Sequence, residues 1–113
     1  MTGKEFDLDS ALAVLRATYQ TRLPAIMQEL SDLVGRIGQA PNSGQAGEVI
    51  GQLRELAHKL AGGAGTFGFP ELGKKARALE LFCEPLLTED RKPRPEELAE
   101  LDALFAALRE EKI

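Results

Sequence analysis

The longest pattern in this 113-residue chain is a stripe of apolar residues that recur at alternating spacings of four and three. Its members are Leu8, Leu12, Leu15, Tyr19, Leu23, Ile26, Leu30, Leu33 and Ile37. This spacing places every member on one face of an α-helix, and it persists for about eight turns. A helix with one apolar face must bury that face against other elements, so the stripe predicts a helical fold.

One proline interrupts this stripe. Pro24 lacks an amide hydrogen, and its ring clashes with the carbonyl group four residues earlier. The pattern therefore predicts either one helix with a kink at Pro24 or a short helix that runs into a longer one. Asp7 or Asp9 is a candidate cap at the start, and Gly35 and Gly38 weaken the end.

A loop rich in Gly, Asn, Pro and Ser at residues 38–47 separates this helix from the next. We expect the second helix to start between Ser43 and Ala46 and to end where Gly65 and Gly68 occur. Its apolar stripe consists of Ile50, Leu53, Ala57, Leu60 and Ala64.

Prolines mark the first turns of two further helices. Pro70 is expected to open a third helix and Pro95 a fourth, because proline suits the first helical position. Thr88–Arg94 is typical of a charged turn, and Pro85 is expected to disturb the last turn of the third helix. The stripes are Leu72, Ala76, Leu79, Cys83 and Leu86 or Leu87 in the third helix, and Leu98, Leu101, Phe105 and Leu108 in the fourth.

Four amphipathic helices with short connections pack most simply as an up-down-up-down four-helix bundle. The composition agrees, because Leu and Ala dominate the apolar residues and aromatic residues make up only 5%. We therefore predict an all-α fold with an N-terminal helical extension and a kink or break near Pro24. We expect residues 1–113 to form a single domain.

Charge and composition disfavour several classes of partner and site. The net charge of −4 disfavours nucleic acid and anionic membranes as partners, and no apolar run approaches the roughly 20 residues of a membrane span. Cys83 is the only cysteine, so no intrachain disulfide and no structural zinc site are expected. The N-terminal stretch lacks the apolar segment of a signal peptide, and we expect a cytoplasmic monomer without a cofactor.

Two glycine patterns near the centre of the chain superficially match nucleotide-binding motifs. Residues 63–68 fit G-x-G-x-x-G, but the dinucleotide fingerprint requires a preceding strand, and here a helix is predicted. Residues 68–75 approximate a P-loop but lack the Ser or Thr that would bind Mg²⁺. We therefore expect no nucleotide site.

His58 is the only histidine, and it lies about 100° around the second helix from Ala57 of the core stripe. A surface histidine without a role is the ordinary interpretation of such a position. Three glycines shortly after the histidine favour a functional interpretation instead, because each costs a helix up to about 1 kcal/mol relative to Ala. They are Gly62, Gly63 and Gly65. They suggest a surface that another protein approaches closely, with helix packing as the rival explanation for one of the three.

Conventional catalytic pairs are scarce. A Ser-His or Cys-His pair would have only His58 as its base, and Cys83 falls in a core stripe. An autonomous enzyme that uses His58 as general base is therefore disfavoured.

The residues around His58 form an ungapped pattern from Leu56 to Glu80. It runs Ala57-His58-x-Leu60-x-Gly62-x-Ala64-x-x-Phe67-Gly68, followed by Leu72 and by Leu79-Glu80. This pattern resembles the signature of histidine-containing phosphotransfer (HPt) domains of bacterial two-component phosphorelays.

The resemblance implies a four-helix bundle whose histidine projects into solvent. It implies that His58 accepts a phosphoryl group on Nε2 from an aspartyl phosphate of one receiver domain and passes it to an aspartate of another. The implied partners are receiver domains of response regulators and hybrid histidine kinases. Mg²⁺ would come from the receiver, so the chain would be a phosphocarrier and not an enzyme. The alternative is a helical adaptor that keeps the HPt fold without the chemistry, which a buried His58 would support.

The resemblance also implies roles for neighbouring residues. Glu80 lies where family members often have Glu or Gln that accepts a hydrogen bond from the histidine Nδ1–H. Position 61, where the family often has a phosphate-stabilising lysine, is Ala61, so Lys59 or Lys75, or else Lys74, would have to replace it. The implied docking surface consists of Arg54, Ala61, Gly62 and Gly65.

Overall fold

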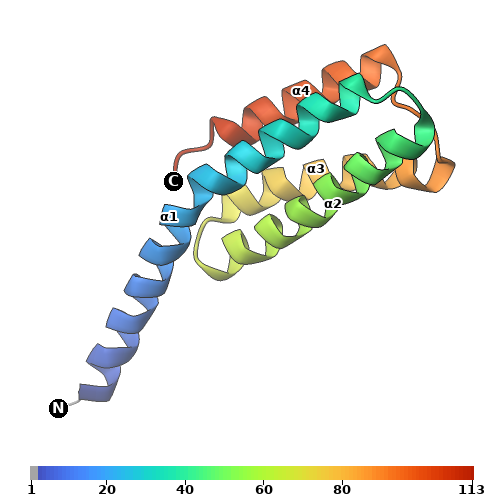
Figure 1. The fold of residues 1–113 in the computed structure, drawn as a ribbon. Helices are drawn as coiled ribbons and strands as arrows, with labels where there is room; N and C mark the ends of the chain where they lie inside the picture. Colours follow the sequence, from blue (N-terminus) through green and yellow to red (C-terminus); the bar gives the residue numbers. More distant parts are fainter. Residues whose placement is uncertain (1–2) are drawn as a thin grey trace.

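A computed structural model describes residues 3–113, and their side chains from residue 7 onward. It contains four helices, α1 (Gly3–Gln39), α2 (Ser43–Thr66), α3 (Pro70–Glu89) and α4 (Pro95–Arg109), in the order shown in Figure 1. The helices pack in a ring, α1 on α2, α2 on α3, α3 on α4 and α4 on α1. The predicted all-α four-helix bundle is confirmed.

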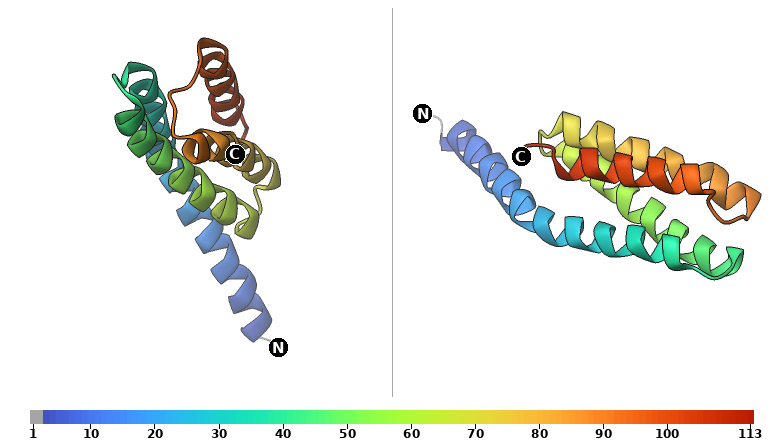
Figure 2. Two further views of the ribbon diagram at one scale, coloured as in Figure 1. Left: turned by 90° about the vertical axis from the view of Figure 1, so that its right-hand side faces the viewer. Right: turned by 90° about the horizontal axis from the view of Figure 1, so that it is seen from above.

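Helix α1 is one continuous helix that passes through Pro24. Figure 2 shows that its N-terminal part leans away from the line of the rest, which agrees with the kinked alternative. The prediction that Asp7 or Asp9 caps its start is wrong, because the helix begins at Gly3 and both residues lie inside it. Each further residue adds a backbone hydrogen bond to an existing helix, so exposed aspartates do not end it.

The apolar stripe of α1 enters the core only at Tyr19. Leu8, Leu12 and Leu15 are 60%, 54% and 49% exposed, so their predicted place in the core is wrong. The reason is length, because α1 extends past the level at which α2 turns into α3 (Figure 1). All side chains of residues 7–18 are exposed, and we call this segment the overhang.

Helix α2 starts at Ser43, within the predicted range, while the loops before α2 and after α3 are shorter than predicted. Only residues 40–42 separate α1 from α2, and the side chain of Asn42 caps α2 by accepting a hydrogen bond from the Gln45 amide over 2.9 Å. Helix α3 continues through Pro85 and ends in a left-handed Asp90 with φ of 50°. The charged turn therefore begins at Asp90 and not at Thr88. Helices α3 and α4 begin at Pro70 and Pro95, as predicted.

Tyr19 makes the closest approach of α1 to the backbone of α2 that the glycines reveal. The Tyr19 hydroxyl group donates a hydrogen bond to the Leu60 carbonyl group over 3.2 Å, and the Tyr19 ring lies over Gly63. A Cβ atom on Gly63 would lie 2.7 Å from Cε1 of Tyr19, so only glycine fits. Of the glycines after His58, this one is explained by helix packing.

None of the helices within residues 3–113 is long and apolar enough to cross a bilayer. In the same part of the chain, no three His, Cys, Asp or Glu side chains gather as a metal ion would require.

Candidate functional site

His58 lies on the face of α2 that points away from the core. Its side chain is 61% exposed, whereas the neighbouring stripe residues Ala57 and Leu60 are buried. The Nδ1 atom of the ring lies 2.8 Å from Oε2 of Glu80 on α3. The other ring nitrogen therefore remains free for a reaction partner.

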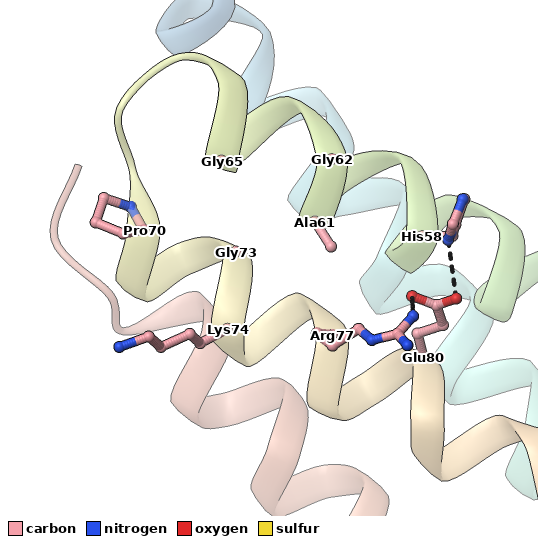
Figure 3. Close-up of a pocket in the computed structure, with 9 residues that line it drawn as sticks. All are labelled: His58, Ala61, Gly62, Gly65, Pro70, Gly73, Lys74, Arg77 and Glu80. Carbon is pink, nitrogen blue, oxygen red and sulfur yellow. Dashed lines mark hydrogen bonds and ion pairs between the residues drawn. The ribbon is translucent and has the colours of Figure 1, made fainter.

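Glu80 is the only charged side chain buried within the described part of the chain, at 1% exposure. Its Oε2 faces His58, and its Oε1 accepts a hydrogen bond from Nη1 of Arg77 over 2.9 Å (Figure 3). Burial alone would raise the pKa of Glu80. The hydrogen bonds from Arg77 and His58, together with their charges, outweigh burial and lower the pKa below its ordinary value.

The protonation state of Glu80 determines the tautomer of His58. An ionised carboxylate only accepts hydrogen bonds, so the proton of a neutral His58 ring sits on Nδ1. The lone pair then lies on Nε2, which is the nucleophilic nitrogen of that tautomer. Arg77 and Glu80 thus favour the tautomer with its lone pair on Nε2, although neither residue contacts that atom.

His58 borders a shallow hollow of about 600 Å³ between α2 and α3 (Figure 3). Small residues form its floor, and Gly62 and Gly65 have nothing within 4 Å of the place where a Cβ atom would stand. The other members of the lining are Ala61, Pro70, Gly73, Lys74, Arg77 and Glu80. This surface lets a partner's backbone or bulky side chain come close to His58.

The predicted docking residues divide into two groups. Ala61, Gly62 and Gly65 line the hollow. Arg54 does not, because its Nε lies 4.0 Å from Oε1 of Glu84 on α3, to one side of the hollow.

Of the three candidate lysines, Lys74 lines the hollow, whereas Lys59 and Lys75 do not. Nζ of Lys59 lies 3.8 Å from Oε1 of Glu55, one turn away on α2. Nζ of Lys75 lies 2.6 Å from Oε1 of Glu111, just beyond the end of α4. Helical phase explains both positions, because Lys59 directly follows His58 and Lys75 directly follows Lys74, and each therefore points about 100° away from a lining residue.

Sequence reasoning missed Arg77. It lines the hollow and binds the carboxylate that faces His58. Its position three residues before Glu80 was the available signal, because side chains three apart on a helix are neighbours. Lys74, one turn before Arg77, also lines the hollow but forms its ion pair with Glu71 over 3.2 Å.

Cys83 is fully buried in the core, as predicted. Burial raises the pKa of its thiol to about 12, so it carries no thiolate nucleophile near neutral pH. His58, in contrast, is exposed, and its Nε2 atom is not engaged by Glu80.

The chain was compared with known proteins. No curated protein and no solved structure matches it significantly. The family model described as Hpt domain matches residues 11–111, which is nearly the whole chain. The geometry around His58 agrees with this match, and we conclude that the chain belongs to the Hpt domain family, whose members act in histidine phosphotransfer.

Proposed function

We propose that this protein is a phosphorelay intermediate that carries a phosphoryl group on His58 between two receiver domains. The observation that carries the proposal is the exposed His58, whose Nδ1 is hydrogen-bonded to the buried Glu80 carboxylate. This histidine lies beside a hollow lined with small residues. The donor is an aspartyl phosphate of one receiver, and the acceptor is an aspartate of a response regulator.

The transfer needs one bond exchange. The lone pair of His58 Nε2 attacks phosphorus, the P–N bond forms, and the P–O bond of the acyl phosphate breaks with its electron pair going to the aspartate carboxylate. The Nδ1 proton stays in place, and the Glu80 carboxylate 2.8 Å away stabilises the positive charge that develops on the ring. The reverse sequence delivers the group to the second receiver.

The receiver supplies the rest of the chemistry. The phosphoryl group carries negative charge that a divalent cation neutralises in most phosphoryl transfers. We propose that Mg²⁺ is held by acidic residues of the receiver, and that this chain contributes the nucleophile and no cofactor.

Arg77 acts on His58 through Glu80. A buried carboxylate without a counter-charge would take up a proton, and its hydroxyl would then donate to Nδ1 and leave the ring proton on Nε2. That tautomer has no lone pair directed at a partner. By holding Glu80 ionised, Arg77 keeps His58 in the reactive form, and we assign it as a positioning residue.

The alternative is an adaptor that binds receivers without accepting phosphate. The 61% exposure of His58 favours the carrier, because an adaptor does not need an accessible imidazole held in one tautomer. Both functions would use the same docking surface, so an assay of phosphoryl transfer is needed to distinguish them.

The direct test is incubation of the purified protein with a receiver domain phosphorylated on its aspartate. We expect transfer of label to the chain, with the acid lability and base stability of a phosphoramidate. His58→Gln should remove the label and leave receiver binding intact. Full labelling of His58→Gln would contradict the assignment, and binding without labelling of the natural protein would favour the adaptor.

A further inference from the structure

Arg77 stands beside the turn of α2 that follows His58. Helices α2 and α3 run antiparallel, because Glu80 faces His58 while Gly73, two turns earlier on α3, approaches residues 61–65 of α2. Arg77 lies between Gly73 and Glu80 in this register. Its side chain extends along α3 to Glu80, where Nη1 of Arg77 lies 2.9 Å from Oε1. The guanidinium group is therefore already level with the His58 ring.

Phosphorylation of His58 changes the charges around the Glu80 carboxylate. While the His58 ring is neutral, Arg77 supplies the positive charge beside this carboxylate, and the two side chains approach its two different oxygens (Figure 3). After the P–N bond forms, the ring keeps its Nδ1 proton and carries a positive charge beside Glu80. The phosphoryl group brings up to about two negative charges to Nε2. One carboxylate then has two cations beside it, and the new anion needs one.

The guanidinium group of Arg77 has room to turn toward the phosphoryl group. The Arg77 side chain is 54% exposed, and within the described part of the chain its hydrogen bonding is the one bond to Glu80. The facing turn of α2 carries only the small residues Ala61 and Gly62 on this side, and Gly62 has open space around it. Glu80 keeps the hydrogen bond from the ring when Arg77 leaves. Arginine also suits the new partner, because its planar fork of N–H donors matches phosphate oxygens.

Two other cations near His58 are less well placed. Lys74 lies one turn before Arg77 on α3, further from the level of His58, and its ion-pair partner Glu71 lies further still. Arg54 lies one turn before His58 on α2. Side chains on a helix lean toward its N-terminus, so Arg54 leans away from His58.

We propose that Arg77 moves its guanidinium group from Glu80 to the phosphoryl oxygens when His58 becomes phosphorylated. Two ion pairs then replace one, the cationic ring with Glu80 and Arg77 with the phosphoryl group. Arg77 thereby supplies, from the facing helix, the phosphate-stabilising cation that Ala61 cannot supply. This inference rests on the proposed function and adds a phosphoryl-binding residue to it.

Urea unfolding of the full chain, before and after phosphorylation by phosphoramidate, tests this proposal at mildly alkaline pH. Phosphorylation should raise the urea midpoint of the natural protein at least about 0.5 M more than that of Arg77→Met, which lacks the charged hydrogen bond to the phosphoryl group. Each comparison is made within one variant, so the basal stability of Arg77→Met cancels. Arg54→Met is the matched control, because it removes an arginine one turn from His58, and it should keep most of the natural effect.

A second variant separates the phosphoryl contact from the positioning role of Arg77. Ala61→Lys in the Arg77→Met background returns a cation to the facing turn of α2 and should restore most of the effect of phosphorylation. Equal effects of phosphorylation on the natural protein and on Arg77→Met, or an equally large loss in Arg54→Met, would overturn the proposal. A natural protein that gains no phosphohistidine would instead contradict the proposed function, and this inference with it.

Discussion

The ring of Tyr19 lies against the bare backbone of Gly63, and this contact joins α1 to the helix that carries His58. Gly62, one residue earlier, has open space around it. Two adjacent glycines of one helix therefore have opposite roles, one in packing and one at the surface.

This difference predicts opposite effects of the same substitution. Gly63→Ala should destabilise the protein by about 1–3 kcal/mol, because the new methyl group overlaps the Tyr19 ring. Gly62→Ala should stabilise it by up to about 1 kcal/mol through higher helix propensity. Urea unfolding of both variants measures the effects, and equal effects would contradict the packing described for Gly63.

Removal of the Glu80 carboxylate should slow phosphorylation of His58. Glu80→Leu leaves Nδ1 without its acceptor, and we expect the rate with phosphoramidate as a small donor to fall about tenfold or more. Glu80→Gln keeps an oxygen acceptor, so its phosphorylation rate should fall much less. Phosphoramidate is the useful donor because no receiver has to dock. An unchanged rate for Glu80→Leu would mean that the ring needs no partner.

Arg77 should influence the tautomer of His58 from a distance. Arg77→Met should move the ring proton partly from Nδ1 to Nε2 and slow labelling by phosphoramidate. Arg77→Lys keeps the positive charge, so its tautomer ratio and labelling rate should lie close to those of the natural protein. Nitrogen NMR of the single histidine reports the tautomer directly. Lys74→Met is the matched control, because Lys74 borders the same hollow and pairs with Glu71. Identical spectra for Arg77→Met and the natural protein would rule out the positioning role.

The lowered pKa of Glu80 predicts an acid-dependent stability. A carboxyl group whose pKa is lower in the folded state stabilises that state above its unfolded pKa. This contribution is lost as the pH falls from the unfolded value of 4.5 through the lower folded value. Urea midpoints measured between pH 7 and pH 3 should therefore decline less steeply for Glu80→Gln than for the natural protein. Parallel declines would show that other carboxylates dominate.

A bulky residue in the hollow should separate docking from chemistry. Gly65→Leu fills part of the surface beside His58, so transfer from a phosphorylated receiver should fall about tenfold or more while labelling by phosphoramidate stays unchanged. Gly51→Leu is the control, because Gly51 is also an α2 glycine with open space but lies outside this hollow. Equal transfer to both variants would place the docking surface elsewhere.

Much of this arrangement could be predicted from the sequence because it depends on local rules. Pro70 and Pro95 open helices wherever they follow a turn, and the phase between Ala57 and His58 determines which one faces solvent. The pattern around His58 identified the family that the match over residues 11–111 shows.

Other features depend on how far the elements extend in space. Periodicity places Leu8 and Leu12 on the same face as Tyr19, but it cannot show that no helix packs against that part of α1. From the sequence, Lys75 was a candidate to stabilise the phosphoryl group. Its ion-pair partner Glu111 lies 36 residues later in the chain, so local spacing does not reveal the pairing. Arg77 gains its importance only because Glu80 is buried, which spacing alone does not reveal.

The site is built from two helices that are consecutive in the sequence. His58 comes from α2, Glu80 and Arg77 from α3, and only residues 67–69 connect these helices. Such neighbours close a short loop, so their pairing requires little ordering of the distant chain ends. Fraying of α1 or α4 in hydrogen-exchange experiments should therefore leave the amides around His58 protected, and the reactive centre should persist through partial opening of the bundle.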